Sequence, residues 1–180
     1  MKRYAIQPGQ TNFRPCEPLL PFRAKGFRGA AILDGSCWWS SEDWDGDADR
    51  KDWNKIKGVT SWATTNDRNS AMVAWRPADE QGVFEVCAYT NYPGRQRQTG
   101  QAIKIRAGER LDFECKIYAR KAQYRFTMQG HVLGIAGHDY RAAWLYREIG
   151  TSFGGANNSA GLYGGAATQK MVMWVEFGKI

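Results

Sequence analysis

The sequence predicts an all-β protein, an antiparallel β-sandwich of jelly-roll type. Its 180 residues include 20 glycines and eight each of tryptophan, tyrosine and phenylalanine, while few stretches show a long helical pattern. Several segments alternate apolar and polar residues, which is typical of strands with one buried face and one wet face. Turn signals recur at the spacing of sandwich proteins, so we expect about nine to eleven strands.

The length is that of one domain. We place a single sandwich domain at residues 27–180, which can bury a core without the help of a metal or a disulfide. Residues 1–26 contain four prolines, which exclude a helix and predict an extended arm. This arm either wraps its own domain or attaches it to a neighbour. The prolines are Pro8, Pro15, Pro18 and Pro21.

The first half of the domain carries three strand signals. Residues 29–33 form a short apolar run that ends at the turn pair Asp34-Gly35. Residues 70–76 and 83–89 flank a segment that contains proline and glycine, so together they predict a β-hairpin with a longer loop.

The second half continues the same pattern. Residues 111–117 place leucine, phenylalanine, cysteine and isoleucine on one face, and residues 124–128 alternate in the same way. Residues 171–177 are apolar on both faces except at Glu176, which predicts a strand in the interior of a sheet. The glycine-rich residues 152–169 are expected to be loop.

The stretch 43–58, DWDGDADRKDWNKIKG, contains five aspartates. A calcium loop of the EF-hand type requires glycine at its sixth position and glutamate at its twelfth, and neither register of the run provides them. Asp49 is a suitable N-cap, and Asp52 lies where a capping-box acid would lie. With Gly58 as a left-handed exit, the run predicts one short helix near residues 50–57.

Three aspartates stay outside this helix and leave a second interpretation open. Asp43, Asp45 and Asp47 alternate along the chain. Their carboxylates, together with backbone carbonyls, could hold a calcium ion on a surface loop. Calcium is the one cofactor that the sequence suggests.

The composition excludes several classes of partner. The formal net charge of +7 attracts anions, but the basic residues are scattered among acidic ones, so nucleic acid is not the expected partner. The four cysteines lack C-x-x-C spacing, which argues against zinc; we favour reduced thiols, while disulfides stay open. No run approaches the roughly 20 apolar residues of a membrane span, and no signal peptide is recognisable.

Four stretches, in this order, resemble a set of largely uncharacterised proteins of gut bacteria and their phages. They are GDADRKDWNKIKGVT (46–60), RNSAMVAWRP (68–77), VFEVCAYTNYPGR (83–95) and LYREIGTSFGGANNSAG (145–161). The chain departs from those proteins at Thr151-Ser152, where they have Pro-Tyr, and at residues 159–161, where they have Thr-Ala-Pro. The resemblance implies a concanavalin-like β-sandwich and carries no established activity.

Concanavalin-like sandwiches include polysaccharide lyases, and the sequence holds part of their set of active-site residue types. Arg68 and Gln129-Gly130-His131 follow the order of the alginate-lyase motifs, but Asn157 stands where a lyase tyrosine would be. We therefore assign no catalytic residue and do not expect an enzyme. The tyrosines that could substitute as proton donors are Tyr140, Tyr146 and Tyr163.

The tryptophans suggest a glycan-binding patch. Trp38, Trp39 and Trp44 cluster beside the acidic run, and flat rings next to a carboxylate such as that of Asp45 are typical of sugar-binding sites. Because Trp38 and Trp39 point to opposite faces of a strand, at least one of them is expected to be buried. The tryptophans expected in the core are Trp62, Trp75, Trp144 and Trp174.

We expect a non-enzymatic module of a phage particle, either structural or adhesive to the host surface. Residues 1–26 would contact neighbouring virion subunits, the chain would form a homo-oligomer, and it would reach the outside in the virion or after lysis. The first alternative is a soluble carbohydrate-binding protein whose partner is a cell-surface polysaccharide. The second alternative is a polysaccharide lyase-like enzyme.

Overall fold

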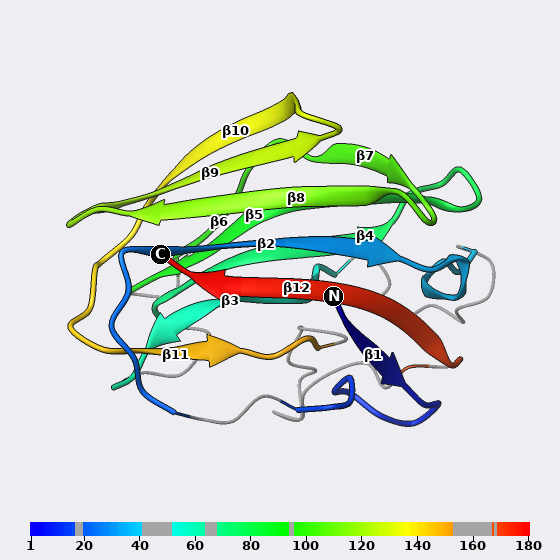
Figure 1. Cartoon of the computed structure of the whole chain (residues 1–180), viewed down its shortest axis with the longest axis horizontal. Helices are drawn as coiled ribbons and strands as arrows, with labels where there is room; N and C mark the ends of the chain where they lie inside the picture. The colour runs from blue at the N-terminus through cyan, green and yellow to red at the C-terminus, as the bar shows by residue number, and fades with distance from the viewer. Residues whose placement is uncertain (17–19, 41–51, 64–67, 94–95, 153–166, 168) are drawn as a thin grey trace.

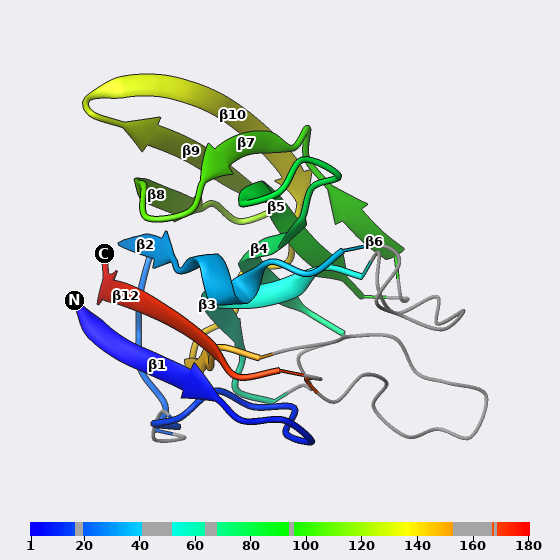
Figure 2. The same cartoon turned by 90° about the vertical axis from the view of Figure 1, so that its right-hand side faces the viewer.

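The computed structural model describes residues 1–16, 20–40, 52–63, 68–93, 96–152, 167 and 169–180. Within these ranges the chain folds into two antiparallel sheets that pack face to face, so the predicted jelly-roll sandwich is confirmed (Figures 1 and 2). The first sheet has the order β1 (Lys2–Ile6), β12 (Met171–Lys179), β2 (Gly26–Leu33), β8 (Arg110–Ile117), β9 (Lys121–Met128) and β10 (His131–Asp139).

The second sheet has the order β11 (Tyr146–Ile149), β3 (Asn54–Ser61), β4 (Ser70–Pro77), β5 (Val83–Tyr92) and β6 (Gln96–Thr99), and β7 (Ile103–Arg106) also pairs with β5. The predicted hairpin is β4 and β5, which pair along their whole length from Ser70↔Asn91 to Pro77↔Phe84. The predicted interior strand is β12, which lies between β1 and β2. The only helical segment among the described residues is the short 3-10 turn η1 (Gly35–Cys37).

The core lies between the two sheets and is rich in aromatic residues. Trp75 of β4 is fully buried, and its ring meets those of Trp39 and Phe84 edge to face, each with ring centroids 5.7 Å apart. Successive strand residues point to opposite faces, so the alternating sequences of β8 and β9 send Phe113, Tyr124 and their neighbours into this core.

The N-terminal residues contribute to the sandwich. β1 pairs with β12 from Lys2↔Val175 to Ile6↔Met171, and it forms one edge of the first sheet. Tyr4, Ile6 and Phe13 are buried in the main core. The described part of residues 1–26, predicted as an extended arm, therefore lies against its own domain.

The helix predicted near residues 50–57 is wrong where the structure describes it. Residues 54–57 belong to β3, which pairs with β11 on one side and β4 on the other. Asp52 and Trp53 are not helical either, while residues 50 and 51 and the predicted N-cap Asp49 lie outside the described residues. Strict alternation would place the side chains of Lys55 and Lys57 on the same face of β3. The register shift between them breaks this alternation, so the two side chains point to opposite faces. Strand pairing on both sides outweighs the weak helix propensity of an eight-residue segment.

Gly58 has a role other than the predicted left-handed helix exit. It lies inside β3, and a Cβ added there would come 2.3 Å from the carbonyl oxygen of Ala71 and 2.7 Å from the Cα of Met72. Backbone atoms cannot move aside as a flexible side chain can. The glycine is needed because β4 approaches so closely.

Gly58→Ala is therefore expected to destabilise the protein by about 1–3 kcal/mol, since β3 and β4 must separate to admit the methyl group. Urea unfolding measures this loss. Gly137→Ala is the matched control, because a Cβ at Gly137 meets nothing within 4 Å. Equal stability of the two variants would contradict the close approach of β3 and β4.

Two tryptophans predicted in the core lie at the surface. Trp144 is 74% exposed and Trp62 is 43% exposed, whereas Trp75 is buried as predicted. The four cysteines are unpaired, as favoured, and three of them are buried. No helix in the described ranges has the length and hydropathy to span a bilayer.

Candidate functional site

Of the predicted glycan-binding tryptophans, the structure describes Trp38 and Trp39, and neither is exposed. Trp39 is buried against Trp75, so its ring faces the core, as expected for one of the pair. Trp38 is half-buried, and its indole Nε1 donates to the carbonyl oxygen of Ala78 at 3.0 Å. The remaining predicted ligands, Trp44 for glycan, Asp45 for glycan or calcium, and Asp43 and Asp47 for calcium, lie outside the described residues.

The lyase-like residues do not come together. His131 opens β10, whereas Arg68 precedes β4 at the end of the sandwich where Ser70 pairs with Asn91. The histidine at that end of the sandwich is His138, near the other end of β10, whose ring is hydrogen-bonded to Thr90 of β5. The length of β10 therefore separates His131 from Arg68. The tyrosine substitutes Tyr140 and Tyr146 are buried in the main core, and Tyr163 lies outside the described residues.

A different group of residues gathers on the second sheet, on the face that points away from the first sheet. Met72, Ala74, Cys87 and Tyr89 alternate with the core residues of β4 and β5 and form a second apolar cluster with Ile149. Trp53 and Ala102 pack against its rim. This second cluster gives the sheet an apolar floor on the side away from the core.

Cations surround the aromatic residues of this face. Arg76 stacks over the Trp53 ring, with its Cζ 4.4 Å from the centroid, and its guanidinium is also bonded to Glu85 at 2.7 Å. Lys55 and Arg97 approach the Tyr89 ring, with Nζ 5.1 Å and Cζ 5.6 Å from the centroid.

We call Trp53, Lys55, Arg76, Tyr89 and Arg97 the cationic-aromatic face. It combines three positive groups with two rings. Arg97 is exposed at its border, while Arg76 is partly exposed and is paired with Glu85.

Burial changes the titration of groups in the cationic-aromatic face. It lowers the pKa of Lys55 to about 8, although the negative charge of Asp52 opposes the shift. The Lys55 ammonium donates to the carbonyl oxygen of Trp53 at 2.5 Å. Burial raises the pKa of Tyr89 to about 12, against the favourable charge of Arg97, so the phenol keeps its proton at neutral pH. The face therefore pairs an amine that loses its proton easily with a phenol that holds one.

Such a face can bind an acidic chain of sugars. Guanidinium and ammonium groups neutralise carboxylates or sulfates, and the partly exposed Trp53 ring gives a flat surface for a sugar ring. The Tyr89 ring is only 3% exposed, so it supports Lys55 and Arg97 from below. In the described residues, no group of three or more histidine, cysteine, aspartate or glutamate side chains could hold a metal ion.

Sequence reasoning missed the cationic-aromatic face. Its residues come from β3, β4, β5 and β6 and from the residue before β3, so their proximity depends on strand order. One signal was present in the sequence: Glu85, Cys87 and Tyr89 alternate along β5 opposite the core residues Val86 and Ala88.

A buried polar network joins the two sheets near this region. His138 of β10 lies 2.9 Å, Nδ1 to Oγ1, from Thr90 of β5, whose hydroxyl lies 2.6 Å from the hydroxyl of Tyr124. Desolvation lowers the pKa of His138, although the charge of Asp139 opposes this shift. His138 is therefore neutral in the folded protein over a wider pH range than in the unfolded chain.

The network predicts a loss of stability in acid. Because the folded state disfavours the proton on His138, its contribution is fully present above the unfolded pKa of about 6.5 and falls as the pH drops below it. Urea unfolding from pH 7.5 to pH 5 measures the slope. His138→Gln should flatten it, while His131→Gln, at an exposed position, should leave it unchanged. A slope that persists in His138→Gln would contradict the assignment.

Comparison with known proteins supports the fold alone. No protein-family model and no curated protein matches the chain. The alginate lyase Aly36B superposes with a TM-score of 0.63 at 11% identity, over 97% of this chain and 78% of that one. The SAP-like pentraxin of Limulus polyphemus superposes with a TM-score of 0.44 at 13% identity, over 96% of this chain and 75% of that one. The κ-carrageenase of Pseudoalteromonas carrageenovora superposes with a TM-score of 0.38 at 6% identity, over 97% of this chain and 78% of that one. The likeness to the alginate lyase shows a common β-sandwich.

Proposed function

We propose that this protein binds an acidic polysaccharide through the cationic-aromatic face of its second sheet. The observation that carries the proposal is the gathering of Lys55, Arg76 and Arg97 around the rings of Trp53 and Tyr89. Three cations within one small face favour a ligand that carries regularly spaced negative charges. The net charge of +7 strengthens the attraction at long range.

Each part of the face has its own role in this binding. Arg97 is exposed and can pair with a carboxylate in two parallel hydrogen bonds. Arg76 is held by Trp53 and Glu85, so it meets the ligand in a preformed position. The common fold with an alginate lyase supports a uronate chain as the first ligand to test.

Calorimetric titration with alginate tests the proposal, and a neutral glucan serves as the ligand control. Arg97→Gln is expected to weaken alginate binding by about tenfold, the loss of one charge-assisted contact. The matched variant is Arg125→Gln, an equally exposed arginine on β9 of the other sheet, and it should bind as the wild type does. An equal loss in both variants would show non-specific attraction, and tight binding of the neutral glucan would exclude a charge-based site.

A second candidate function is β-elimination on the same acidic chain, favoured by the pKa of about 8 at Lys55. The neutral amine would take the proton from the carbon next to the uronate carboxylate, and Arg97 would neutralise that carboxylate. A carbon–carbon double bond would form as the carbon–oxygen bond to the leaving sugar breaks, and the leaving oxygen would take a proton from solvent water, since Tyr89 is only 3% exposed.

Ultraviolet absorbance of unsaturated sugar ends tests this activity. We expect a rate that rises with pH through about 8. Lys55→Arg keeps the positive charge but has no neutral form at that pH, so it should bind alginate and fail to cleave it. If the wild type releases no unsaturated sugar ends, the protein does not cleave alginate and the β-elimination proposal is wrong.

A place in a phage particle is a separate proposal, and it rests on the sequence resemblance. It requires the chain to assemble. Sedimentation of the intact chain over a range of concentrations should show a homo-oligomer. A monomer at every concentration would contradict it.

A further inference from the structure

Among the described residues, β10 lies at one edge of the first sheet, with no strand paired on its outer side. The direction of the backbone groups at this edge can be assigned. The backbone N–H of Asp139 donates to Oε1 of Gln98 at 2.9 Å, and the amide Nε2 of Gln98 donates to the carbonyl oxygen of Asp139 at 3.1 Å. The next residue, Tyr140, donates its N–H to Arg120 on the other side. Asp139 therefore presents both backbone groups away from β9.

Alternation extends this direction along the strand. In an antiparallel pair, residues two apart direct their backbone groups the same way. Gly137 and Ile135 pair with Gln123 and Arg125 of β9 in unbroken register with Asp139, so their N–H and C=O groups also point away from β9. In the part of the chain that the structure describes, no further hydrogen bond satisfies these groups.

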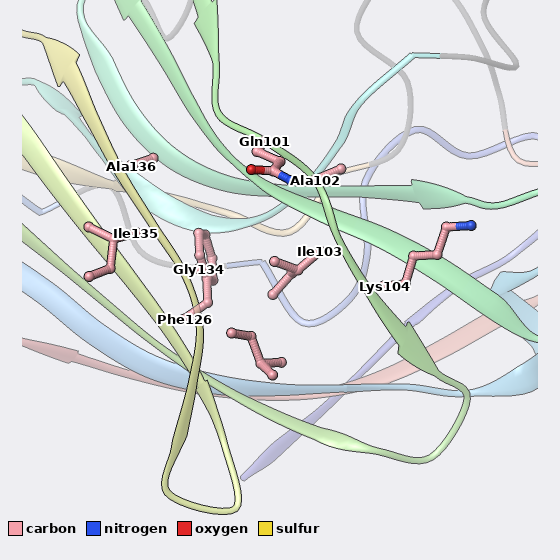
Figure 3. A pocket seen from close by; sticks show the side chains of 9 residues that line it. Gln101, Ala102, Ile103, Lys104, Phe126, Gly134, Ile135 and Ala136 are labelled. Atoms are coloured by element: carbon pink, nitrogen blue, oxygen red, sulfur yellow. The ribbon is translucent and has the colours of Figure 1, made fainter.

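A cavity of about 320 Å³ lies beside this edge. Figure 3 shows Ile103 and Ala102 on one side of it and Gly134, Ile135 and Ala136 of β10 on the other. Its lining is about equally polar and apolar, and the exposed large hydrophobic side chains of β10 continue it onto the surface: Val132, Leu133 and Ile135. The edge thus offers outward backbone groups and a partly apolar cavity in one place.

We propose that the free edge of β10 binds an extended peptide, with alternating apolar and acidic residues, as an added strand. Gln98 already shows the required chemistry, since its amide makes with Asp139 the two bonds that a peptide group would make with Gly137 and Ile135. Alternate side chains of the added strand would enter the cavity, where they meet Ile103 and Phe126.

The charges beside the edge select the other side chains. Lys104 at the cavity and Arg125, the cross-strand neighbour of Ile135, are both exposed. Side chains that point away from the cavity would share a face with Ile135 and, one strand farther in, with Arg125, so acidic residues fit there. The edge strand β10 belongs to the first sheet, whereas the cationic-aromatic face belongs to the second; the cavity lies between them, with Ala102 at the rim of the second apolar cluster. The peptide site does not depend on the proposed polysaccharide.

Fluorescence anisotropy with a short labelled peptide of alternating valine and glutamate tests the proposal. The wild type should bind it, and the same peptide with all of its backbone nitrogens methylated should not. Gly137→Pro removes the outward N–H without touching the pairing to β9, as edge strands allow, and should weaken binding at least fivefold. Gly137→Ala keeps the N–H and should bind as the wild type does.

Amide hydrogen exchange on the wild type gives a second measurement that needs no variant. The amides of Ile135 and Gly137 should exchange fast in the free protein and slow down when the peptide is bound. Failure of the wild type to bind, equal binding by Gly137→Pro and Gly137→Ala, or no protection at these two amides would overturn the proposal. So would self-association that Gly137→Pro abolishes, because a second copy would then occupy the edge.

Discussion

Lys57→Ala is expected to lower the free energy of unfolding by about 3 kcal/mol, because it leaves a carboxylate without its partner inside the sandwich. The Lys57 Nζ lies 2.6 Å from Oε1 of Glu148, and the two side chains are only 1% and 17% exposed. The same ammonium lies 4.8 Å from the centroid of the Tyr4 ring. The pair therefore joins β3 and β11 to the first sheet, and urea unfolding measures its loss.

A double variant separates the charge from the packing. Lys57→Met with Glu148→Leu replaces both charges by apolar groups of similar volume, so it should lie within about 1 kcal/mol of the wild type. If Lys57→Ala alone is as stable as the wild type, the ion pair is not buried as described.

Trp75→Ala is expected to cost about 3–5 kcal/mol, the second large effect. Trp75 is fully buried in β4 and contacts Trp39 and Phe84, so its removal opens a cavity between the sheets. Thermal and urea unfolding should both shift to lower midpoints.

Trp144→Ala is the matched control, since the sequence predicts both tryptophans in the core. Trp144 is 74% exposed and is contacted by Arg23, whose Cζ lies 4.1 Å from the ring centroid. Its removal should cost less than about 1 kcal/mol. Similar losses in the two variants would contradict the placement of one ring inside and the other outside.

Strands with one buried face were predictable from the sequence. β8 and β9 alternate cleanly, and the β4–β5 hairpin is bounded by turn residues, so local pattern and tertiary structure agree. β12 was predictable because a strand in the interior of a sheet is apolar on both faces.

β3 was not predictable for the opposite reason. Its sequence, NKIKGVTS, contains two lysines, one of which is buried beside Glu148 of β11 and over the rings of Tyr4 and Phe177. The partner that makes this lysine compatible with a buried strand comes from a segment far along the chain. Local helix signals therefore decided the prediction, and pairing with β4 and β11 decided the structure.

The candidate site depends on strand order in the same way. In the sequence, Lys55, Tyr89 and Arg97 look like unrelated residues on the wet faces of strands. The order of β3, β4, β5 and β6 in the sheet brings Lys55 and Arg97 to the ring of Tyr89. Trp62 and Trp144 were predicted in the core because they lie next to strands. Trp62 directly follows β3 and Trp144 precedes β11, but both side chains are exposed to solvent.

Nuclear magnetic resonance of the tryptophan indoles tests the central claim most directly. Trp53 belongs to the cationic-aromatic face, while Trp62 and Trp144 are exposed elsewhere and offer the alternative platform for a sugar. On titration with alginate oligosaccharides, the Trp53 indole signal should shift in a saturable manner, and the Trp144 signal should stay in place. A shift of Trp144 or Trp62 with an unmoved Trp53 would contradict binding at the cationic-aromatic face.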